Sequence, residues 1–470
     1  MAYETYQLVE FGMNTYKSAL PYRLKNKLKE LIIDQIGIQI GCAKFPWSQA
    51  VYKHARFFPS HGKSTIVYYG DHLSPEQSAF VNACFSHSQD FDDTCLKVQT
   101  HPGAVVIPVA FAIGEEIGAS GEEILRAIAA GMEVMLRVAY SVSPDCLKRG
   151  HHTPPAAGPF GAAMTAGLLM GLNEEQLLNA MGIAGSFSGG LTEYTQSGGS
   201  VKRIHTAIPA MAGIRAAYLA KLGMTGPATV LEGKKGFCNV FADNGDISRL
   251  TNKLYEEYLI ESVALKAYNC CYFIHAPLKG LLSICNEHHL HSDEITGVTV
   301  GTSEYGTVHV GQIPEPTDAL GAQFSLHFTL ALGLLHEPPN IYTYSNENLM
   351  NSQIRSFARK ITVYEDEICT KEYPNNWGAV VNVMTRSKQV FSKRIRYPKG
   401  NPENPMDKNE IKEKFYRNTF QMIGKDAAET IYSKLTKIDT IPHVSDLTEL
   451  FIKDKTKLYI DLGNTSRKSS

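Results

Sequence analysis

The feature that most constrains this fold is a series of long helical patterns that fills most of the first 260 residues. Residues 121–142 (GEEILRAIAAGMEVMLRVAYSV) carry apolar side chains at the three- and four-residue spacing of one helix face, and acids in the first turn. Residues 158–191 predict two more helices, with Asn173 as the N-cap of the second. These segments are rich in Ala and Gly, and small side chains let helices approach closely. This half of the chain is therefore predicted to be a tightly packed bundle.

A different pattern follows Lys266. Residues 296–303, 360–366, 379–385 and 389–398 predict strands, and the last two are joined by a short Arg-Ser-Lys connection typical of a hairpin. The chain has 470 residues, more than the roughly 250–300 that one core usually holds. We therefore predict a mainly α fold, with a large all-helical domain and a smaller α+β domain.

The predicted boundaries follow these changes of pattern. The helical domain is expected at 1–264 and again at 400–460, after a linker rich in Pro and Asn. The α+β domain is expected at 265–399, and residues 461–470 are expected to form a disordered tail.

Composition excludes several classes of function. Net charge is −1 and no long basic run occurs, so nucleic-acid binding has little electrostatic support. The chain shows no secretory leader and no stretch of 18 uninterrupted apolar residues, which predicts a cytoplasmic protein with no membrane partner. Nine cysteines without a CxxC pattern predict free thiols rather than a disulfide framework or a thiolate-bound metal.

Four segments carry polar residues where a helical bundle does not need them. They are QDFDDTCLKVQTHPGA (89–104), KRGHHTPPAAGPFGAA (148–163), SGGSVKRIHTA (197–207) and LKAYNCCYFIHAP (265–277). A solvated loop or a satisfied core histidine explains any one of them alone. Together they combine Lys and Arg side chains with several imidazoles, which suits an anion rich in carboxylates, because imidazole can give or take a proton near neutral pH.

Local chain breakers are expected to shape two of these segments. Pro154 and Pro155 are predicted to delay the following helix, so that His151 and His152 lie on the loop before it. Those histidines have no helical partner and no acid at ligand spacing, so no metal site is predicted there.

The same segments resemble the MmgE/PrpD family, which includes 2-methylcitrate dehydratase and cis-aconitate decarboxylase. The resemblance runs from about residue 30 to 405 and lies in the motifs DFDDT, THPGAVVIPVAFA, GHHTPPAAGPFGAAMTAG, GGSVKRIHTAIPAMAG, LEGKKGF, KAYNCCYFIHAP and TDALGAQFSLHF. It implies an all-helical large domain, a smaller α+β domain, a homodimer, and chemistry that uses neither a metal nor another cofactor.

The resemblance also implies roles for single residues. The expected catalytic residues are Asp90, His101, His152, Lys202 and His275. The expected substrate-binding residues are Thr94, Arg203 and Phe328. Phe328 stands where decarboxylase-like members have a tyrosine that faces the pocket, so the phenol is missing here.

The function predicted from these features is that of a metal-independent lyase acting on a citrate-derived polycarboxylate. The spacing between FDDT and THPG, the CC…HAP junction and GSVKR favour decarboxylation of cis-aconitate to itaconate and CO2. Dehydration of 2-methylcitrate, or another lyase or epimerase reaction of the family, is the alternative. A non-catalytic dimeric binding module is the alternative from a different class: the missing phenol favours it, and the five expected catalytic groups oppose it.

Overall fold

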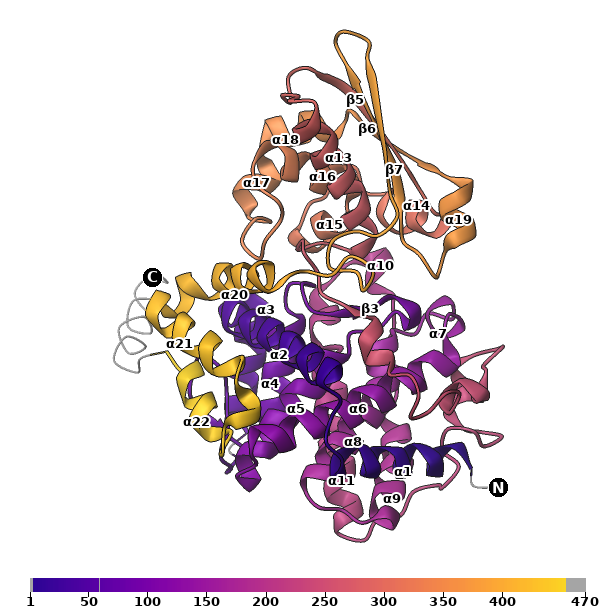
Figure 1. Ribbon diagram of the computed structural model, residues 1–470, viewed down its shortest axis with the longest axis vertical. Helices are drawn as coiled ribbons and strands as arrows, with labels where there is room; N and C mark the ends of the chain where they lie inside the picture. The colour runs from indigo at the N-terminus through magenta and orange to yellow at the C-terminus, as the bar shows by residue number, and fades with distance from the viewer. Residues whose placement is uncertain (1–2, 59, 454–470) are drawn as a thin grey trace. The chain divides into compact units, whose positions relative to one another are not determined.

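The computed structural model describes residues 3–58 and 60–453 and divides into two compact units (Figure 1). Unit 1 holds the described residues of 1–88, 92–263 and 408–470, and unit 2 holds 89–91 and 264–407. The expected tail at 461–470, and the last part of the C-terminal helical segment from 454 on, lie outside the described residues.

Unit 1 is built of helices. Its longer helices are α1 (Glu4–Lys17), α2 (Tyr22–Cys42), α3 (Pro46–Phe57), α4 (Pro75–His87), α5 (Pro102–Ile117), α6 (Gly121–Val142), α8 (Thr153–Leu169), α9 (Glu174–Ala184), α11 (Ala207–Lys221), α20 (Lys408–Ile423) and α21 (Lys425–Leu435). Its short ones are α7 (Asp145–Lys148), α10 (Tyr194–Ser197), α12 (Phe237–Phe241) and α22 (Ser445–Thr448). Two-residue strands occur at β1 (Ser64–Thr65), β2 (His72–Leu73) and β3 (Thr94–Cys95), and β4 (Val263–Ala264) spans the boundary with unit 2.

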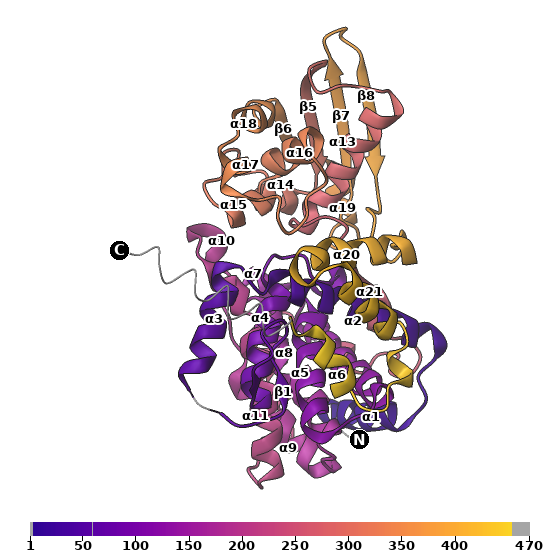
Figure 2. The same ribbon diagram turned by 90° about the vertical axis from the view of Figure 1, so that its left-hand side faces the viewer.

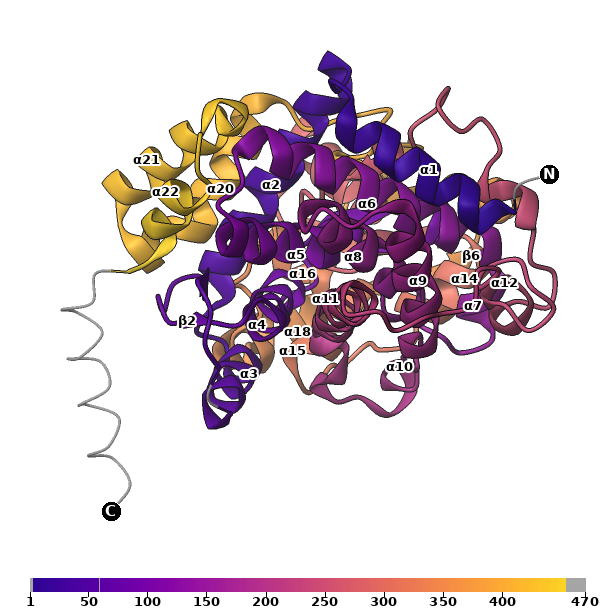
Figure 3. The ribbon, with the colours of Figure 1, turned by 90° about the horizontal axis from the view of Figure 1, so that it is seen from below.

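The centre of unit 1 is α8, which packs against α5, α6, α9 and α11 (Figure 3). Every residue of α8 is buried, as expected of a helix that is apolar all round. Glycines make the closest crossing possible. A Cβ on Gly131 of α6 would lie 1.8 Å from Thr165 Oγ1, and one on Gly161 of α8 would lie 2.6 Å from Met135 Cβ. The predicted role of small residues in close helix packing is confirmed at this crossing.

Capping fixes where several helices begin. Ser120 and Glu123 form a capping box at the start of α6, and Asn173 with Gln176 forms another at α9, which confirms the predicted N-cap. His151 and His152 precede α8, as predicted, but Pro154 and Pro155 do not delay it, because the helix begins at Thr153 and holds both prolines in its first turn. Proline fits there, since a first-turn backbone N–H has no partner within the helix.

Unit 2 contains a four-stranded mixed sheet in the order β6-β5-β7-β8 (Figure 2). The strands are β5 (Ile295–Thr302), β6 (Ile361–Glu365), β7 (Ala379–Thr385) and β8 (Val390–Ile395). β5 runs parallel to β6 and antiparallel to β7, while β7 and β8 form the predicted hairpin. β8 ends three residues earlier than its predicted segment.

The helices of unit 2 surround an apolar core. They are α13 (His275–Glu287), α14 (Glu304–Val310), α15 (Ala319–Gln323), α16 (Leu326–Leu335), α17 (Asn346–Met350), α18 (Ser352–Ala358) and α19 (Glu367–Glu372). α13 packs against β7 and β8, and buried residues of α13, α16 and the sheet share one hydrophobic cluster. The observed elements confirm the predicted mainly α fold with a small α+β part.

Short 3₁₀ segments connect several of these elements. They are η1 (Leu96–Val98), η2 (Gly185–Phe187), η3 (Ser200–Ile204), η4 (Ile247–Leu250), η5 (Leu259–Ser262), η6 (Tyr272–Ile274), η7 (Ile438–Thr440) and η8 (Glu449–Phe451). Among the described helices, none combines the length and apolar character needed to cross a bilayer. All nine cysteines are free, as predicted, and the structure shows that all nine are buried.

Candidate active site

The acidic segment between α4 and α5 is buried, not a solvated connector. In unit 1, Asp92 and Asp93 are both 0% exposed and His101 is 9% exposed. His87 is the last residue of α4, and His101 is the residue before Pro102 begins α5. The two helix ends thus place two imidazoles beside two carboxyl groups in the interior of unit 1.

Asp93 is held by the start of α5. Its carboxyl oxygens accept hydrogen bonds from Gln35 Nε2 (2.6 Å) and from the backbone N–H of Gly103 (3.0 Å). Burial, together with the neighbouring Asp92 carboxylate, raises the pKa of Asp93 to about 7. A Cβ at Gly103 would lie 2.4 Å from Asp93 Oδ1, so this contact requires glycine.

His101 has a defined orientation. Its Nδ1 lies 2.8 Å from the backbone carbonyl oxygen of Asp93, and a carbonyl oxygen only accepts, so Nδ1 donates. Asp92 Oδ2 lies 3.4 Å from the same nitrogen. A carboxylate this close stabilises an imidazolium, which is the form that can deliver a proton.

Lys202 reaches the same region from a segment far along the chain. It lies in η3, directly after Gly198 and Gly199, whose φ angles of 79° and 101° favour glycine. Lys202 is 3% exposed, and its Nζ lies 3.2 Å from His87 Nε2. On its other ring nitrogen, His87 Nδ1 lies 2.8 Å from Asp92 Oδ2.

His152 and His205 form a second pair of imidazoles next to Lys202. His152 is the N-cap residue of α8, and its Nδ1 lies 2.9 Å from His205 Nδ1, so one ring donates and the other accepts. Burial lowers the pKa of His152 well below its usual range, with further lowering by Lys202 and neighbouring imidazoles. Burial and Lys202 likewise lower the pKa of His205 to about 4. Both rings are therefore neutral near pH 7.

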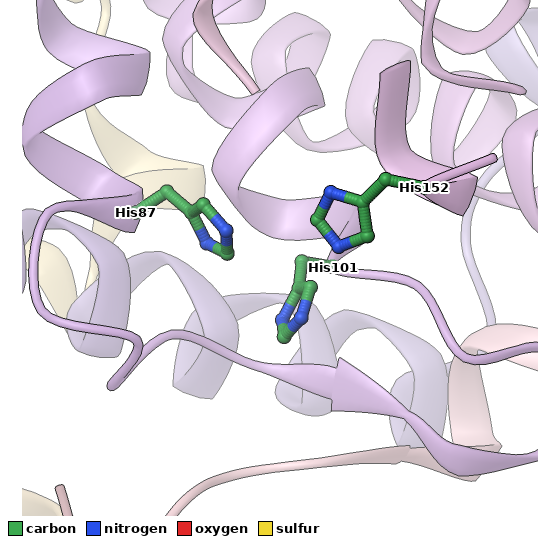
Figure 4. Close-up of side chains that lie close together, drawn as sticks. All are labelled: His87, His101 and His152. Atoms are coloured by element: carbon green, nitrogen blue, oxygen red, sulfur yellow. The ribbon is translucent and has the colours of Figure 1, made fainter. Parts of the chain in front are cut away.

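The imidazoles of His87, His101 and His152 gather in one place (Figure 4), with one nitrogen of each within 4.8 Å of the others. Three such nitrogens could contact a single metal ion. The Lys202 ammonium beside His87 Nε2 opposes a cation and favours an anion there. Because Lys202 Nζ already contacts His87 Nε2, an anion beside the ammonium is favoured over a metal ion at that nitrogen.

The other two expected binding residues of unit 1 are buried as well. Thr94 lies in β3 and is 5% exposed. Arg203 is 1% exposed, and its guanidinium lies 5.1 Å from the centre of the Trp47 ring.

In unit 2, Asp90 forms a buried ion pair. Lys266 Nζ donates to the Asp90 carbonyl oxygen at 2.6 Å and lies 3.2 Å from Asp90 Oδ1. Asp90 has a φ of 55°, a left-handed conformation that Asp tolerates better than most residues. Side chains of Asn269 and Gln323 donate to the carbonyl oxygen of Gln89, which fixes the backbone before the aspartate.

His275 and Phe328 are also in unit 2. His275 is the first residue of α13, and its ring stacks on Tyr272 with centroids 4.6 Å apart and lies near Tyr268. Phe328 is 1% exposed and belongs to the apolar core of this unit. Beside it, burial lowers the pKa of His327.

Comparison with known proteins fits this arrangement. Residues 6–250 match the model of the MmgE/PrpD N-terminal domain, and residues 268–438 match that of the C-terminal domain. The chain belongs to the MmgE/PrpD family.

Similar proteins of known name align with nearly the whole chain. A cis-aconitate decarboxylase of Aspergillus terreus is 24% identical over 468 residues, covering 95% of each chain. The cis-aconitate decarboxylase-like protein oryM of Aspergillus oryzae is 26% identical over 472 residues, covering 95% of this chain and 96% of its own. Cis-aconitate decarboxylase of Mus musculus is 23% identical over 440 residues, covering 90% and 88%.

Within this MmgE/PrpD chain, the structure brings His101, His152 and Lys202 together in unit 1, while Asp90 and His275 belong to unit 2. Sequence reasoning missed His87, because SAFVNACFSHS predicts a helix interior. The signal that could have found it is a histidine near the end of a predicted helix, shortly before the acidic motif DFDD.

Proposed function

We propose that this protein is a lyase that acts on a citrate-derived polycarboxylate, and most specifically that it decarboxylates cis-aconitate to itaconate and CO2. The observation that carries the proposal is the buried group of Lys202, His101 and His152 in unit 1. Its support from outside the structure is family membership and alignment with proteins named cis-aconitate decarboxylase over 95% of the chain.

Substrate recognition rests on the Lys202 ammonium. Its charge is buried beside the neutral His152–His205 pair, in which one ring keeps an N–H that can donate to a carboxylate oxygen. Hydrogen bonds between ionised partners are roughly twice as strong as neutral ones. A tricarboxylate would thus be held by Lys202, with Arg203 and Thr94 as further proposed contacts.

The chemical step needs stabilised electron density and a proton. When the C–C bond to the leaving carboxylate breaks, its electron pair spreads through the adjacent double bond toward a remaining carboxylate. The positive charge of Lys202 near that carboxylate would lower the barrier. A proton then adds to the carbon next to that carboxylate, giving itaconate.

The two unit-1 imidazoles suit different roles in this step. His101 lies 3.4 Å from the Asp92 carboxylate, so it is the better general acid. His152 is kept neutral by burial and by Lys202, which suits a hydrogen-bonding role. Asp90 and His275 remain proposed catalytic residues on the basis of the family motifs.

The test is a substrate panel. The purified full-length protein is incubated separately with cis-aconitate, 2-methylcitrate and citrate, and products are followed by mass spectrometry and CO2 trapping. We expect itaconate and CO2 in equal amounts from cis-aconitate. Conversion of 2-methylcitrate to 2-methylaconitate alone would replace the decarboxylase by a dehydratase. No product from any acid would favour a binding module.

Chelation tests the metal-independent part of the proposal. Preincubation with EDTA followed by buffer exchange is expected to leave itaconate formation unchanged, because Lys202 supplies the positive charge. Loss of activity that Zn²⁺ restores would contradict this and assign the three gathered imidazoles to a metal.

A further inference from the structure

A buried chain of contacts runs from Asp92 through His87 to Lys202. Asp92 Oδ2 lies 2.8 Å from His87 Nδ1, and His87 Nε2 lies 3.2 Å from Lys202 Nζ. The exposed fractions of Asp92, His87 and Lys202 are 0%, 0% and 3%. Both ring nitrogens of His87 are thus engaged, one by an acid and one by an amine.

For an ionised Asp92, the hydrogen-bond geometry assigns the protons of His87 and Lys202. An ionised Asp92 only accepts, so His87 Nδ1 carries a proton and donates it. In a neutral imidazole the other nitrogen, Nε2, is then an acceptor, and Lys202 donates an N–H to it. The carboxylate therefore selects the His87 tautomer that holds the Lys202 ammonium in one direction.

The backbone supports the same geometry. The Thr206 hydroxyl, at the end of the segment that carries Lys202, donates to the Ala83 carbonyl oxygen of α4 at 2.8 Å. α4 ends at His87, so donor and acceptor are carried by two segments that are tied together. Asp92 Oδ2 also lies 3.4 Å from His101 Nδ1, so one carboxylate adjoins both imidazoles.

We propose that Asp92 and His87 are positioning residues that hold the substrate-binding ammonium of Lys202, and that Asp92 also orients the general acid His101. This proposal about Asp92 and His87 rests on the proposed function, because it takes Lys202 to be the group that binds the substrate. Neither positioning residue needs to touch the substrate. The effect of His87 reaches the reaction through Lys202, and the effect of Asp92 reaches it through Lys202 and His101.

The first test is the tautomer itself, which does not depend on turnover. Wild-type protein with ¹⁵N-labelled imidazoles is compared with His87→Ala by long-range ¹H–¹⁵N NMR, which assigns the missing signals to His87. We expect a proton on Nδ1 and none on Nε2 at neutral pH. A proton on Nε2 would overturn the proposal, whether or not any acid is turned over.

The second test uses Asp92→Asn. The amide NH2 can donate to His87 Nδ1, which favours the opposite tautomer and turns an N–H toward the Lys202 ammonium. We expect kcat/KM for cis-aconitate to fall about 10- to 100-fold and the alkaline limb of the pH profile to move to lower pH. An unchanged profile with a merely lower melting temperature would assign Asp92 a structural role only.

The third test is a double-mutant cycle with His87→Ala and Lys202→Met. If His87 acts through Lys202, the double variant should be no slower than Lys202→Met alone. Losses that multiply would show that His87 acts independently and would overturn the proposal. The control is His291→Gln, an exposed histidine of unit 2 that should leave kcat/KM unchanged.

Discussion

Two buried lysines, Lys266 of unit 2 and Lys202 of unit 1, have different surroundings. In unit 2, Asp90 and Lys266 form an ion pair, and the lysine also donates to a backbone carbonyl. In unit 1, the Lys202 ammonium lies among imidazoles whose protonation it helps to suppress. Pairing produces a fixed structural contact. Because His152 and His205 stay neutral, the positive charge of this cluster is that of Lys202, to which we propose that an anionic ligand binds.

The largest expected effect is at His101 of unit 1. His101→Gln keeps an amide that can donate to the Asp93 carbonyl but removes the proposed acid. Activity on cis-aconitate should fall about 10²- to 10⁴-fold, the contribution of a positioned proton donor, with little change in melting temperature. His54→Gln, an exposed histidine in the same unit, is the control. A loss below threefold would remove His101 from the chemistry.

The ion pair of unit 2 should instead show its effect in stability. Lys266→Met leaves the buried Asp90 without this cation, and breaking a buried pair on one side costs about 3–5 kcal/mol. Urea unfolding is followed by Trp377 of unit 2 in a Trp47→Phe background, since the chain has two tryptophans. Adding Asp90→Asn should recover part of the loss. No change on Lys266→Met would contradict the structural role of the pair.

A substitution at Gly103 of unit 1 is expected to have an effect of intermediate size on stability. The methyl group of Gly103→Ala would press on Asp93, whose carbonyl oxygen holds His101. We expect a stability loss of about 1–3 kcal/mol from overpacking, together with a lower kcat. Gly189→Ala is the matched control, because its methyl group would meet no atom within 4 Å. Equal stability and equal kcat of the two variants would show that the Gly103–Asp93 contact is not tight.

The last expected effect is a pH dependence that arises in unit 1. The pKa of His205 is about 4 in the folded chain and about 6.5 when unfolded, so unfolding takes up a proton between these values. Folded stability from this group is therefore lost as pH falls from 6.5 toward 4, by about 1.4 kcal/mol per pH unit. Asp93, with its pKa raised to about 7, has the opposite sign over the same range.

Comparison of wild type with His205→Asn isolates the histidine contribution. The wild type should lose stability relative to the variant on acidification when Trp47 of unit 1 reports unfolding. A pH-independent difference at Trp47 would show that His205 is not held in its neutral form.

Local sequence patterns predicted much of the fold. Residues 121–142 coincide with α6, because apolar periodicity and a capping box agree there. The strand segment 379–385 coincides with β7, whose burial alternates along the chain.

The candidate site was less accessible to sequence reasoning. Family motifs pointed to Lys202 and His101, but nothing local shows that Asp93 would be fully buried with a raised pKa. The role of His87 arises from its contact with Lys202, which lies 115 positions further along the chain. Such pairings depend on how the helices pack.

The central claim is that the Lys202 ammonium of unit 1 binds and activates a polycarboxylate. The most direct measurement is itaconate formation from cis-aconitate by Lys202→Ala beside Lys221→Ala, an exposed lysine at the end of α11. We predict that Lys202→Ala loses at least about 10²-fold in activity with its fold intact, while Lys221→Ala matches the wild type. Wild-type turnover by Lys202→Ala would contradict the account.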